Sequence, residues 1–351
     1  AAACDNDGTR TNSTATETTT QAAASTSAPT TAPTTLAPPS PTTTPEPAPP
    51  VTSETTAWQG ADFTELDVFL ERTNGEAFAI WEDGAMVHEW YRTDPGYTRD
   101  IASAQKSLLS LLIGRAIGDG LLTIDTVIDE VLGSTWTPHG KSTGITIEHL
   151  LTMTSGLDNS LSVISPPGAS WLYSDAFSTL FDVLTTVTGR PLNDVAREWL
   201  FVPAGATSSV FYERPVGPYS PIGLRSTVPD LVKFGRLVLA GGPPGLTDDW
   251  LTDSFTASQP FNQSYGHLWW LLAGDTYMLP GPNPTPLPGP MVPTAPTDMV
   301  AALGKDDQKL YISAELDLVV ARLGGSGSTK SALARSDYDI ELWDRLTTLR
   351  G

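Results

Sequence analysis

A run of leucine and isoleucine residues constrains the fold more than any other feature of the sequence. From Ala104 to about Asp119 the residues favour a helix, and Leu or Ile stands at positions 108, 109, 111, 112, 113 and 117. Apolar side chains therefore cover nearly the whole circumference of the predicted helix instead of a single stripe. We expect a helix of this kind to be buried, so the rest of the chain must pack around it.

The first turn of this predicted helix carries Ser103 and, three residues later, Lys106. The helical period places two such side chains on one face, within reach of each other. The hydroxyl would lie at the positive end of the helix dipole, beside free N–H groups that could hold an oxyanion. Burial lowers the pKa of an ammonium group, so Lys106 could act as a base that activates Ser103 for acyl transfer. The alternative is a helix-capping Ser followed by a Lys that reaches solvent.

Two motifs together carry a resemblance to a known family. Ser103-Ala104-Gln105-Lys106 followed by Tyr173-Ser174-Asp175 resembles the S-x-x-K and Y-x-N pair of the penicillin-recognising serine hydrolases, in the branch that includes class C β-lactamases, esterases and nylon-oligomer hydrolases. The resemblance runs from about Trp58 to the C-terminus. It implies an α/β (α+β) fold of the β-lactamase/transpeptidase type, with an antiparallel sheet flanked by helices and an all-helical lobe.

The same resemblance implies roles for the second motif. The Tyr173 hydroxyl would share a proton relay with Lys106: one of the two takes the Ser103 proton, and Tyr173 then protonates the leaving group. The sequence leaves open which of them is the base in acylation. Asp175 stands where the family usually has Asn. An ionised Asp only accepts hydrogen bonds from a substrate, and its charge near Lys106 would raise the pKa of that ammonium.

The last strand region departs from the β-lactamase pattern. The K-T-G motif that holds an antibiotic's carboxylate is absent, which lowers the odds that β-lactams are the main substrates. Gly304-Lys305 resembles the esterase and nylon-oligomer-hydrolase version, in which the N–H after the Gly completes an oxyanion hole with that of Ser103. The Lys305 side chain alone would be an ordinary solvated lysine. Trp269 or Trp270 would line the pocket, with core packing as the alternative.

Periodicity and turn signals predict the remaining elements. We expect an amphipathic helix over 62–73, a helix over 146–154 and a final helix over 336–349 that packs beside the first one. Asp83-Gly84 between two apolar runs predicts a hairpin. We also expect a strand over 265–271 and a second hairpin formed by residues 301–312 and 316–323. His149 is interpreted as a satisfied core histidine. Eight prolines between 279 and 298 are too many for a strand, and we expect a rim or lid there.

The N-terminal part of the sequence has a different composition. Between Thr9 and Ala57, 41 of 49 residues are Thr, Pro, Ala or Ser, which predicts a disordered tether over 1–57 and a folded domain over 58–351. Ala1-Ala2-Ala3-Cys4 resembles the lipobox of a bacterial lipoprotein whose signal peptide has been removed, with Cys4 as the lipidation site. We expect an extracytoplasmic protein, a cell-surface lipoprotein or a secreted one, that meets a membrane only through this anchor.

Charge and residue counts exclude several classes of partner. The formal net charge is −20, so nucleic acid is a poor partner. Four His without an H-x-x-H pair and a single Cys give no metal site of the usual spacing, and we expect no cofactor. No G-x-S-x-G occurs, which disfavours an enzyme of the α/β-hydrolase type.

The prediction from sequence is a serine hydrolase that cleaves a small-molecule ester or amide through an acyl-enzyme on Ser103. One alternative within the same chemistry is a penicillin-binding D-Ala-D-Ala peptidase or β-lactamase. The other alternative is a catalytically inactive, surface-tethered binding module of the same fold, for which Asp175 is the best indication. Retention of Ser103, Lys106 and Tyr173 argues against the inactive module, because a pure binder has no need of a buried Lys beside a Ser.

Overall fold

The computed structural model describes residues 56–138, 143–215, 220–281, 283–328 and 334–351. The chain divides between Pro49 and Pro50, and the description below concerns the second unit. Cys4 and nearly all of the predicted tether lie outside the described residues. The domain boundary, the lipid anchor and the tether therefore stay predictions.

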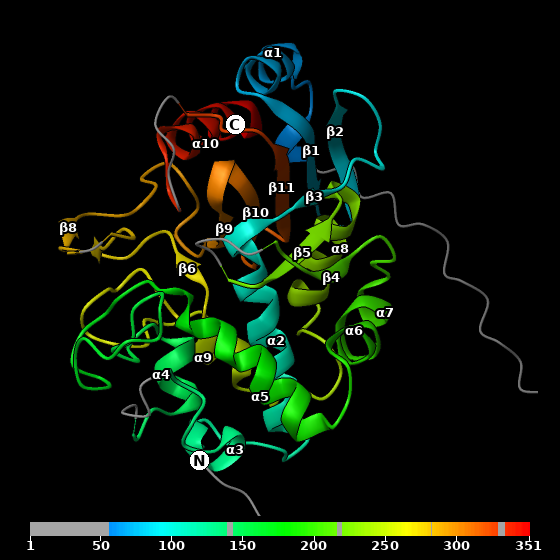
Figure 1. Ribbon diagram of the computed structural model, residues 1–351. Helices are drawn as coiled ribbons and strands as arrows, with labels where there is room; N and C mark the ends of the chain where they lie inside the picture. The colour runs from blue at the N-terminus through cyan, green and yellow to red at the C-terminus, as the bar shows by residue number, and fades with distance from the viewer. Residues whose placement is uncertain (1–55, 139–142, 216–219, 282, 329–333) are drawn as a thin grey trace, which may run out of the picture. The chain divides into compact units, whose positions relative to one another are not determined.

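An antiparallel sheet stands at the centre of this unit (Figure 1). Its strand order within the described residues is β2-β1-β11-β10-β9-β6. The predicted hairpin at Asp83-Gly84 is confirmed, since both residues adopt the positive φ angles that a tight two-residue turn requires. The strands are β1 (Gly75–Glu82), β2 (Ala85–Tyr91), β6 (Trp270–Leu271), β9 (Val300–Gly304), β10 (Gln308–Ser313) and β11 (Leu318–Gly324).

Helices cover both faces of the sheet because successive strand residues point to opposite sides. Tyr311 of β10 packs edge-on against Trp343 of α10 (Asp337–Arg350), with ring centroids 5.3 Å apart. Helix α8 (Val228–Leu239) covers the other face, where it packs against β1, β10 and β11. The predicted pairing of the first and last helices is confirmed: Phe69 of α1 (Thr64–Arg72) stacks on Tyr338 at 5.2 Å.

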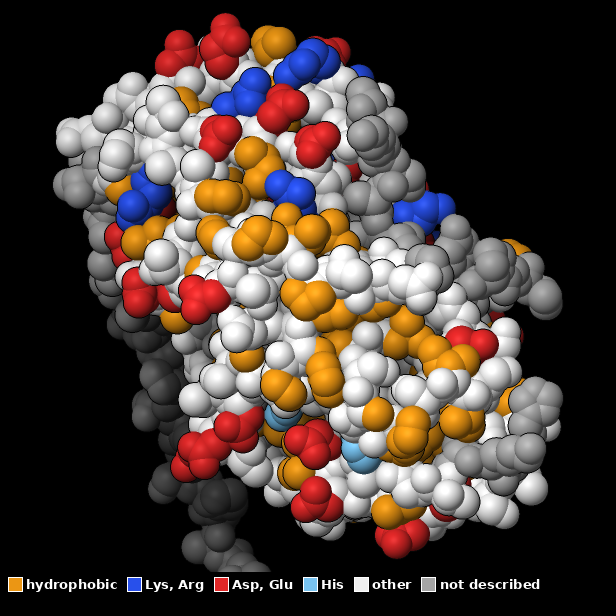
Figure 2. Space-filling model, turned by 90° about the vertical axis from the view of Figure 1, so that its left-hand side faces the viewer, with side chains coloured by type: hydrophobic (Ala, Val, Ile, Leu, Met, Phe, Trp, Pro, Cys, Tyr) orange, Lys and Arg blue, Asp and Glu red, His pale blue; other side chains and the backbone are white. Residues whose placement is uncertain are grey.

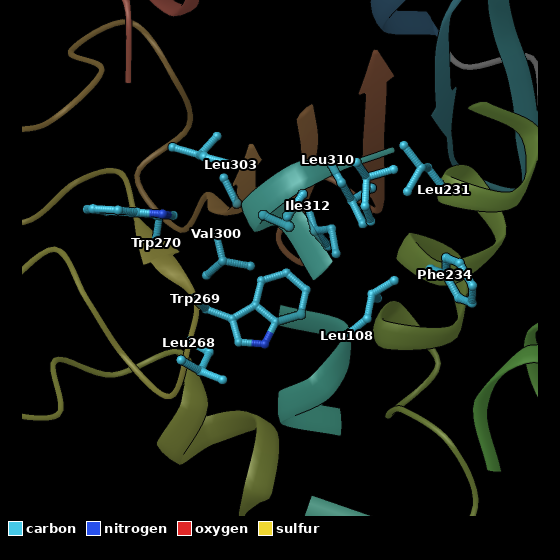
Figure 3. Packing of buried hydrophobic residues seen from close by; sticks show 14 of the residues in the cluster. Leu108, Leu231, Phe234, Leu268, Trp269, Trp270, Val300, Leu303, Leu310 and Ile312 are labelled. Carbon is cyan, nitrogen blue, oxygen red and sulfur yellow. The ribbon is translucent and has the colours of Figure 1, made fainter. Parts of the chain in front are cut away.

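The predicted central helix is confirmed as α2 (Gln105–Gly118), which follows a 3₁₀ turn, η2 (Ala102–Ala104). Every residue from Gln105 to Gly114 is buried, as the all-round apolar sequence requires. Figure 3 shows Leu108 of this helix packed among apolar side chains of α8 and of strands β9 and β10. Helix α2 thus joins the sheet to the lobe beyond it.

Short helices gather around the far end of α2, in the lower part of Figure 1, and form the predicted helical lobe. A small sheet in the order β3-β5-β4 borders it, and β7 pairs with β8. The helical segments are α3 (Ile128–Leu132), α4 (Ile147–Leu151), η3 (Asp175–Ser178), α5 (Thr179–Thr188), α6 (Leu192–Ala196), η4 (Arg197–Phe201), α7 (Val202–Ala204) and α9 (Trp250–Ser254), with η1 (Thr56–Trp58) and η5 (Lys305–Asp307) elsewhere. The small strands are β3 (Arg99–Asp100), β4 (Val210–Glu213), β5 (Ile222–Ser226), β7 (Thr276–Tyr277) and β8 (Leu287–Pro288).

Three predictions about strands were wrong. Only Trp270 and Leu271 of the predicted strand 265–271 are extended within the sheet, because Leu268 turns the chain with a φ of 62°. The segment 301–312 is two strands instead of one, because Asp306 and Asp307 both have positive φ and reverse the chain. The proline-rich segment 279–298 contains the short strand β8, whose pairing with β7 tolerates Pro288 at a sheet edge.

Figure 2 shows the side of the molecule that carries β8 and α4 in Figure 1, and apolar side chains form a broken band across it. Exposed apolar residues include Val163 and Ile164 in a loop and Leu287 in β8. The role of segment 279–298 as a rim or lid over the site stays a prediction. Within the described residues no helix combines the length and apolar character needed to cross a bilayer.

Candidate active site

Ser103 and Lys106 lie together at the junction of η2 and α2, as the helical spacing predicts. The Lys106 ammonium donates a hydrogen bond of 2.9 Å to the Ser103 hydroxyl oxygen. Ser103 is half-buried, whereas Lys106 is only 2% exposed. The hydroxyl can therefore meet a ligand while the ammonium stays away from water.

The surroundings of Lys106 explain its altered acidity. The ammonium nitrogen lies 3.9 Å from the Phe177 ring centroid and 4.7 Å from that of Tyr173, and 3.8 Å from the nearer Asp175 carboxylate oxygen. Burial lowers the pKa of Lys106 from its ordinary value of 10.5 to about 8. The charge of Asp175 opposes this shift, and the charge of Arg214 reinforces it. The prediction that Asp175 would raise this pKa is correct in direction, but burial outweighs it.

Tyr173 lies against the other side of this cluster. Its hydroxyl is buried and has no hydrogen-bond partner among the described residues. Burial raises the pKa of Tyr173 above its ordinary value and the charge of Asp175 adds to the rise, while the nearby Ser103 hydroxyl acts in the opposite sense. At neutral pH the Tyr173 phenol therefore keeps its proton. An orphaned buried hydroxyl beside a nucleophile is well suited to bind a group that arrives with a ligand.

Asp175 joins this cluster to a cavity on the side of the helical lobe. Its backbone N–H donates to the Asn159 side chain at 2.9 Å, and its carboxylate is about one-fifth exposed. Asp182 lines the same cavity, and no Lys or Arg is among the described residues that do. The cavity has a volume of about 230 Å³ and is lined by Leu132, Trp136, Asn159, Leu161, Asp175, Ser178, Thr179, Asp182, Ser220 and Pro221.

Gly304, the last residue of β9, approaches the nucleophile's turn. A Cβ placed on Gly304 would overlap the carbonyl oxygen of Ile101 and lie 3.3 Å from the Ala104 nitrogen. Its φ of −116° suits any residue, so the glycine is required by space and not by backbone conformation. The residue that follows, Lys305, therefore begins its turn directly beside the start of the helix.

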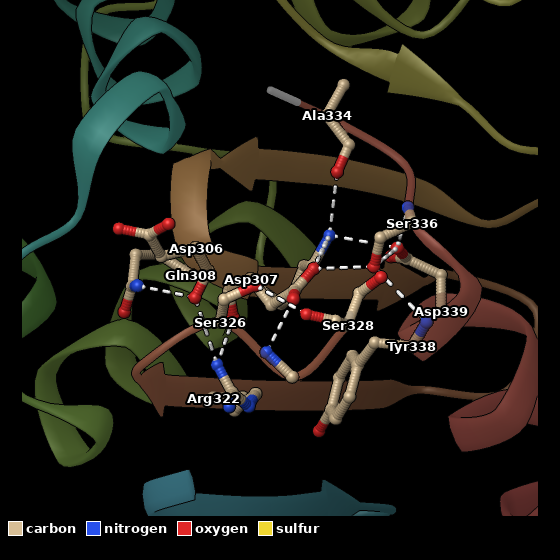
Figure 4. A network of polar contacts seen from close by, with 12 residues as sticks. Asp306, Asp307, Gln308, Arg322, Ser326, Ser328, Ala334, Ser336, Tyr338 and Asp339 are labelled. Carbon is tan, nitrogen blue, oxygen red and sulfur yellow. Dashed lines mark hydrogen bonds and ion pairs between the residues drawn. The ribbon is translucent and has the colours of Figure 1, made fainter. Parts of the chain in front are cut away.

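A buried polar network holds the turn after Lys305 (Figure 4). Arg322 donates to the carbonyl oxygens of Asp306 and Asp307, at 3.3 and 2.7 Å. The Lys309 ammonium lies 3.2 Å from the Asp307 carboxylate and 3.0 Å from that of Asp339. Because two consecutive residues without the freedom of glycine have positive φ here, these contacts stabilise a turn that is otherwise unfavourable.

The prediction for Trp269 was wrong. Trp269 is fully buried and packs against Phe255 in the core, at 5.2 Å between ring centroids, so it does not line the site. Trp270 points the other way (Figure 3). Its ring stacks on that of Tyr173, with centroids 5.6 Å apart. His149 is satisfied, as predicted, but it is half-buried and caps α4, where its ring nitrogen accepts from the Thr146 N–H at 3.1 Å.

Three residues of this region had no role in the sequence analysis. Phe177 packs on Lys106, while Asp100 and Arg214 pair with each other beside the nucleophile's turn. Phe177 could have been suspected because it lies two positions after the motif Tyr173-Ser174-Asp175. Arg214 gave no signal, since it is a single arginine far from Ser103 in sequence. Among the described residues no group of three or more His, Cys, Asp or Glu side chains could hold a metal ion.

Comparison with known proteins found a family model, a relative and solved structures that resemble this chain. Residues 66–281 match the family model described as Beta-lactamase. A Bacillus subtilis (strain 168) protein, provisionally named penicillin-binding protein PbpX, is 29% identical over 168 residues. That match covers 40% of this chain, and the chain spans only 41% of that relative's length.

Solved structures share the fold at low sequence identity. A beta-lactamase of Mycobacterium bovis is 19% identical, with a TM-score of 0.58 over 78% of this chain and 93% of its own. EstCE1, described as a hydrolase with promiscuous acyltransferase activity, is 15% identical, with a TM-score of 0.60 over 83% of this chain and 97% of its own. These likenesses confirm the predicted fold.

Proposed function

The chain belongs to the beta-lactamase family, and from that premise we propose that it is a serine hydrolase which cleaves a small-molecule ester or amide through an acyl-enzyme on Ser103. The observation that carries the proposal is the 2.9 Å contact between the Lys106 ammonium and the Ser103 hydroxyl, made inside an apolar helix. A purely structural Lys at this place would only destabilise the fold, because burying its charge costs free energy.

Lys106 is the better candidate for the base in acylation. With a pKa of about 8 it is neutral in an appreciable fraction of molecules near neutral pH, whereas the raised pKa of Tyr173 keeps the phenol protonated. Neutral Lys106 takes the Ser103 proton as the hydroxyl oxygen attacks the carbonyl carbon. The sequence left this choice open, and the difference between the two environments favours Lys106.

The later steps use the remaining groups. The carbonyl oxygen of the substrate becomes an oxyanion, held by the N–H groups of Ser103 and Lys305. The proximity of Gly304 to the Ile101 turn supports this pair. Collapse of the intermediate breaks the bond to the leaving group, which takes a proton from Tyr173, and Tyr173 regains one from the Lys106 ammonium. Water, losing a proton to neutral Lys106, then attacks the acyl carbon, and the Ser103 oxygen leaves and recovers that proton.

The charges beside the site favour some substrates over others. Asp175 and Asp182 line the adjacent cavity without a basic residue among the described ones. We infer that this cavity accepts a neutral or cationic portion of the substrate and disfavours a carboxylate. This preference and the missing K-T-G both argue against penicillins as the main substrates. The penicillin-binding peptidase or β-lactamase remains the second candidate because of the family itself.

The place of action is a separate proposal that rests on residues 1–57 alone. The lipobox-like Cys4 and the Thr- and Pro-rich tether support an exported protein held at a membrane surface.

Turnover assays with the full chain test the proposed function. The chain is mixed with p-nitrophenyl esters, the matching anilides and a penicillin, and product release is followed with time. Ser103→Ala should abolish turnover, whereas Ser110→Ala should not; the Ser110 hydroxyl, on the same helix, is buried and has no partner among the described residues. Equal turnover by the wild-type chain and Ser103→Ala would refute the proposal, and a stable penicillin adduct without ester turnover would favour the second candidate.

A further inference from the structure

The residue before Ser103 has an unusual backbone conformation. Ala102 has a φ of 52°, in the left-handed region that residues with a Cβ seldom adopt. Such a conformation costs free energy and persists only where the surroundings enforce it. The nucleophile therefore sits directly after a turn that needs support from other groups.

Asp100 provides the first part of that support. Its carboxylate accepts the Ala102 N–H at 2.8 Å, which closes a small turn around Ile101. The Ile101 N–H in turn donates to the Leu224 carbonyl oxygen of β5 at 2.9 Å. The Asp100 carboxylate and the Leu224 carbonyl oxygen thus both hold the turn that precedes Ser103.

Arg214 fixes that carboxylate from a distant part of the chain. Its guanidinium forms two hydrogen bonds to Asp100, of 2.6 and 2.7 Å, one to each carboxylate oxygen. The Tyr212 hydroxyl adds a third, at 2.6 Å. A third guanidinium nitrogen donates to the carbonyl oxygens of Ser220 and Ile222, at 3.1 and 2.8 Å. A bidentate pair of this kind specifies orientation as well as charge.

The two side chains are well shielded. Arg214 is 14% exposed and Asp100 29% exposed. Burial alone would raise the pKa of Asp100, but the hydrogen bonds from Arg214 and Tyr212 outweigh it, so the pKa lies below its ordinary value and the carboxylate stays ionised. The pair is therefore intact throughout the neutral range.

We infer that Arg214 is a positioning residue for the nucleophile: through Asp100 it holds the Ala102 turn in its left-handed conformation and so fixes where the Ser103 hydroxyl and N–H point. The inference rests on the proposed function, since it concerns the reactivity of Ser103. A merely structural salt bridge would stabilise the fold without affecting that reactivity beyond the loss of folded protein.

Arg214 also acts on Lys106 through its charge. The charged and titratable groups around Lys106 are Asp175 and Tyr173 from the helical lobe and Arg214 from the strand side. Removal of the guanidinium charge leaves the opposing Asp175 unbalanced and raises the pKa of Lys106. The rate of reaction at Ser103 should rise with pH as Lys106 loses its proton, and we call this part of the pH profile the rising limb. Loss of Arg214 should therefore move the rising limb to higher pH, whereas loss of packing alone would not.

The test measures the rate at which a fluorophosphonate modifies Ser103 in the full chain, across pH 6 to 10. Arg214→Met should slow the modification at least tenfold and shift the limb to higher pH. Arg214→Lys keeps the positive charge but makes fewer hydrogen bonds to Asp100. Its modification rate should therefore lie between those of the wild-type chain and Arg214→Met, while the rising limb of its pH profile stays where it is in the wild type. The matched control is Arg190→Met, which removes an exposed pair with Glu198 and should change neither quantity.

A second substitution separates positioning from general structure. Ala102→Gly removes the conformational cost at φ 52°, so in the Arg214→Met background it should restore part of the lost rate. A merely structural Arg214 would give no such rescue when the rates are compared per folded molecule, since the orientation of Ser103 would not depend on it. If Arg214→Met does not fold, Tyr212→Phe serves instead: it removes one bond to Asp100 and should slow the reaction a few-fold without moving the limb.

The outcomes distinguish this inference from the proposed function. A wild-type chain that reacts at Ser103, together with a folded Arg214→Met that reacts equally fast, overturns the inference and leaves the function standing. Slowing without rescue by Ala102→Gly also overturns it. A wild-type chain that does not react at all refutes the proposed function, and the inference with it.

Discussion

Gly304 and Ile101 come so close that a single added carbon on the glycine would overlap the carbonyl oxygen of the isoleucine. This contact joins the last residue of β9 to the turn that precedes Ser103. It brings the two backbone segments of the proposed oxyanion hole together, although they lie about two hundred residues apart in sequence.

The first prediction follows from this contact. Gly304→Ala should push β9 away from the turn and lower kcat/KM roughly 100-fold or more, the usual effect of losing one oxyanion donor. Gly281→Ala is the matched control, since a Cβ there meets nothing within 4 Å. A Gly304→Ala variant with wild-type kinetics would show that the Lys305 N–H takes no part.

The pH dependence of acylation should follow Lys106. Because only the neutral amine can take the Ser103 proton, the acylation rate should rise with pH through about 8. Asp175→Asn removes an anion that raises the pKa of Lys106, so the limb should move to lower pH. Asp182→Asn, in the same cavity but not against Lys106, should leave it in place. A limb that stays fixed, or moves to higher pH, in Asp175→Asn would contradict this assignment.

Lys106 should also lower the free energy of unfolding of the domain at neutral pH. Its pKa is about 8 in the folded chain and near 10.5 when unfolded, so the unfolded chain binds this proton more tightly. The penalty is complete below pH 8 and is relieved as pH rises from 8 to 10.5; it amounts to about 3 kcal/mol. Lys106→Met should therefore raise Tm at pH 7 while abolishing activity, and this gain should shrink toward pH 10. A lower Tm for Lys106→Met at pH 7 would contradict the argument.

The network around Lys309 should contribute stability. Lys309 is fully buried between two carboxylates, so Lys309→Met leaves uncompensated charge and should cost about 3 to 5 kcal/mol in the free energy of unfolding. Arg190 makes a 2.6 Å pair with Glu198 in which the two side chains are 37% and 61% exposed, and Arg190→Met should cost less than about 1 kcal/mol. Denaturant titration of both variants measures the difference, and equal costs would count against a stabilising network.

Much of the fold could be predicted because its signals are local. The all-round apolar run of α2 and the Asp83-Gly84 turn each depend on a few neighbouring residues, and both are found in the structure. The predicted strand at Trp269 failed because tertiary packing turns the chain at Leu268, which no local propensity indicates. Likewise, the reversal of the chain at Asp306 and Asp307 depends on contacts with Lys309 in β10 and Arg322 in β11. Neither residue is one that predicts a turn from sequence.

In the candidate site, too, the local contact could be predicted from the sequence and the long-range one could not. The spacing of Ser103 and Lys106 follows from one helical turn, so the sequence predicted their contact. Asp100 and Arg214 meet only because β3 and β4 both pair with β5. A contact of this kind depends on the order of the strands in the sheet, which we did not predict from the sequence.

The most direct test of the account is the mass of the intact chain after incubation with a fluorophosphonate. We predict a single adduct that maps to Ser103, is absent in Ser103→Ala, is slowed in Lys106→Ala and is unchanged in Ser110→Ala. No adduct on the folded wild-type chain, or an adduct that persists in Ser103→Ala, would contradict the claim that Lys106 activates Ser103 as a nucleophile.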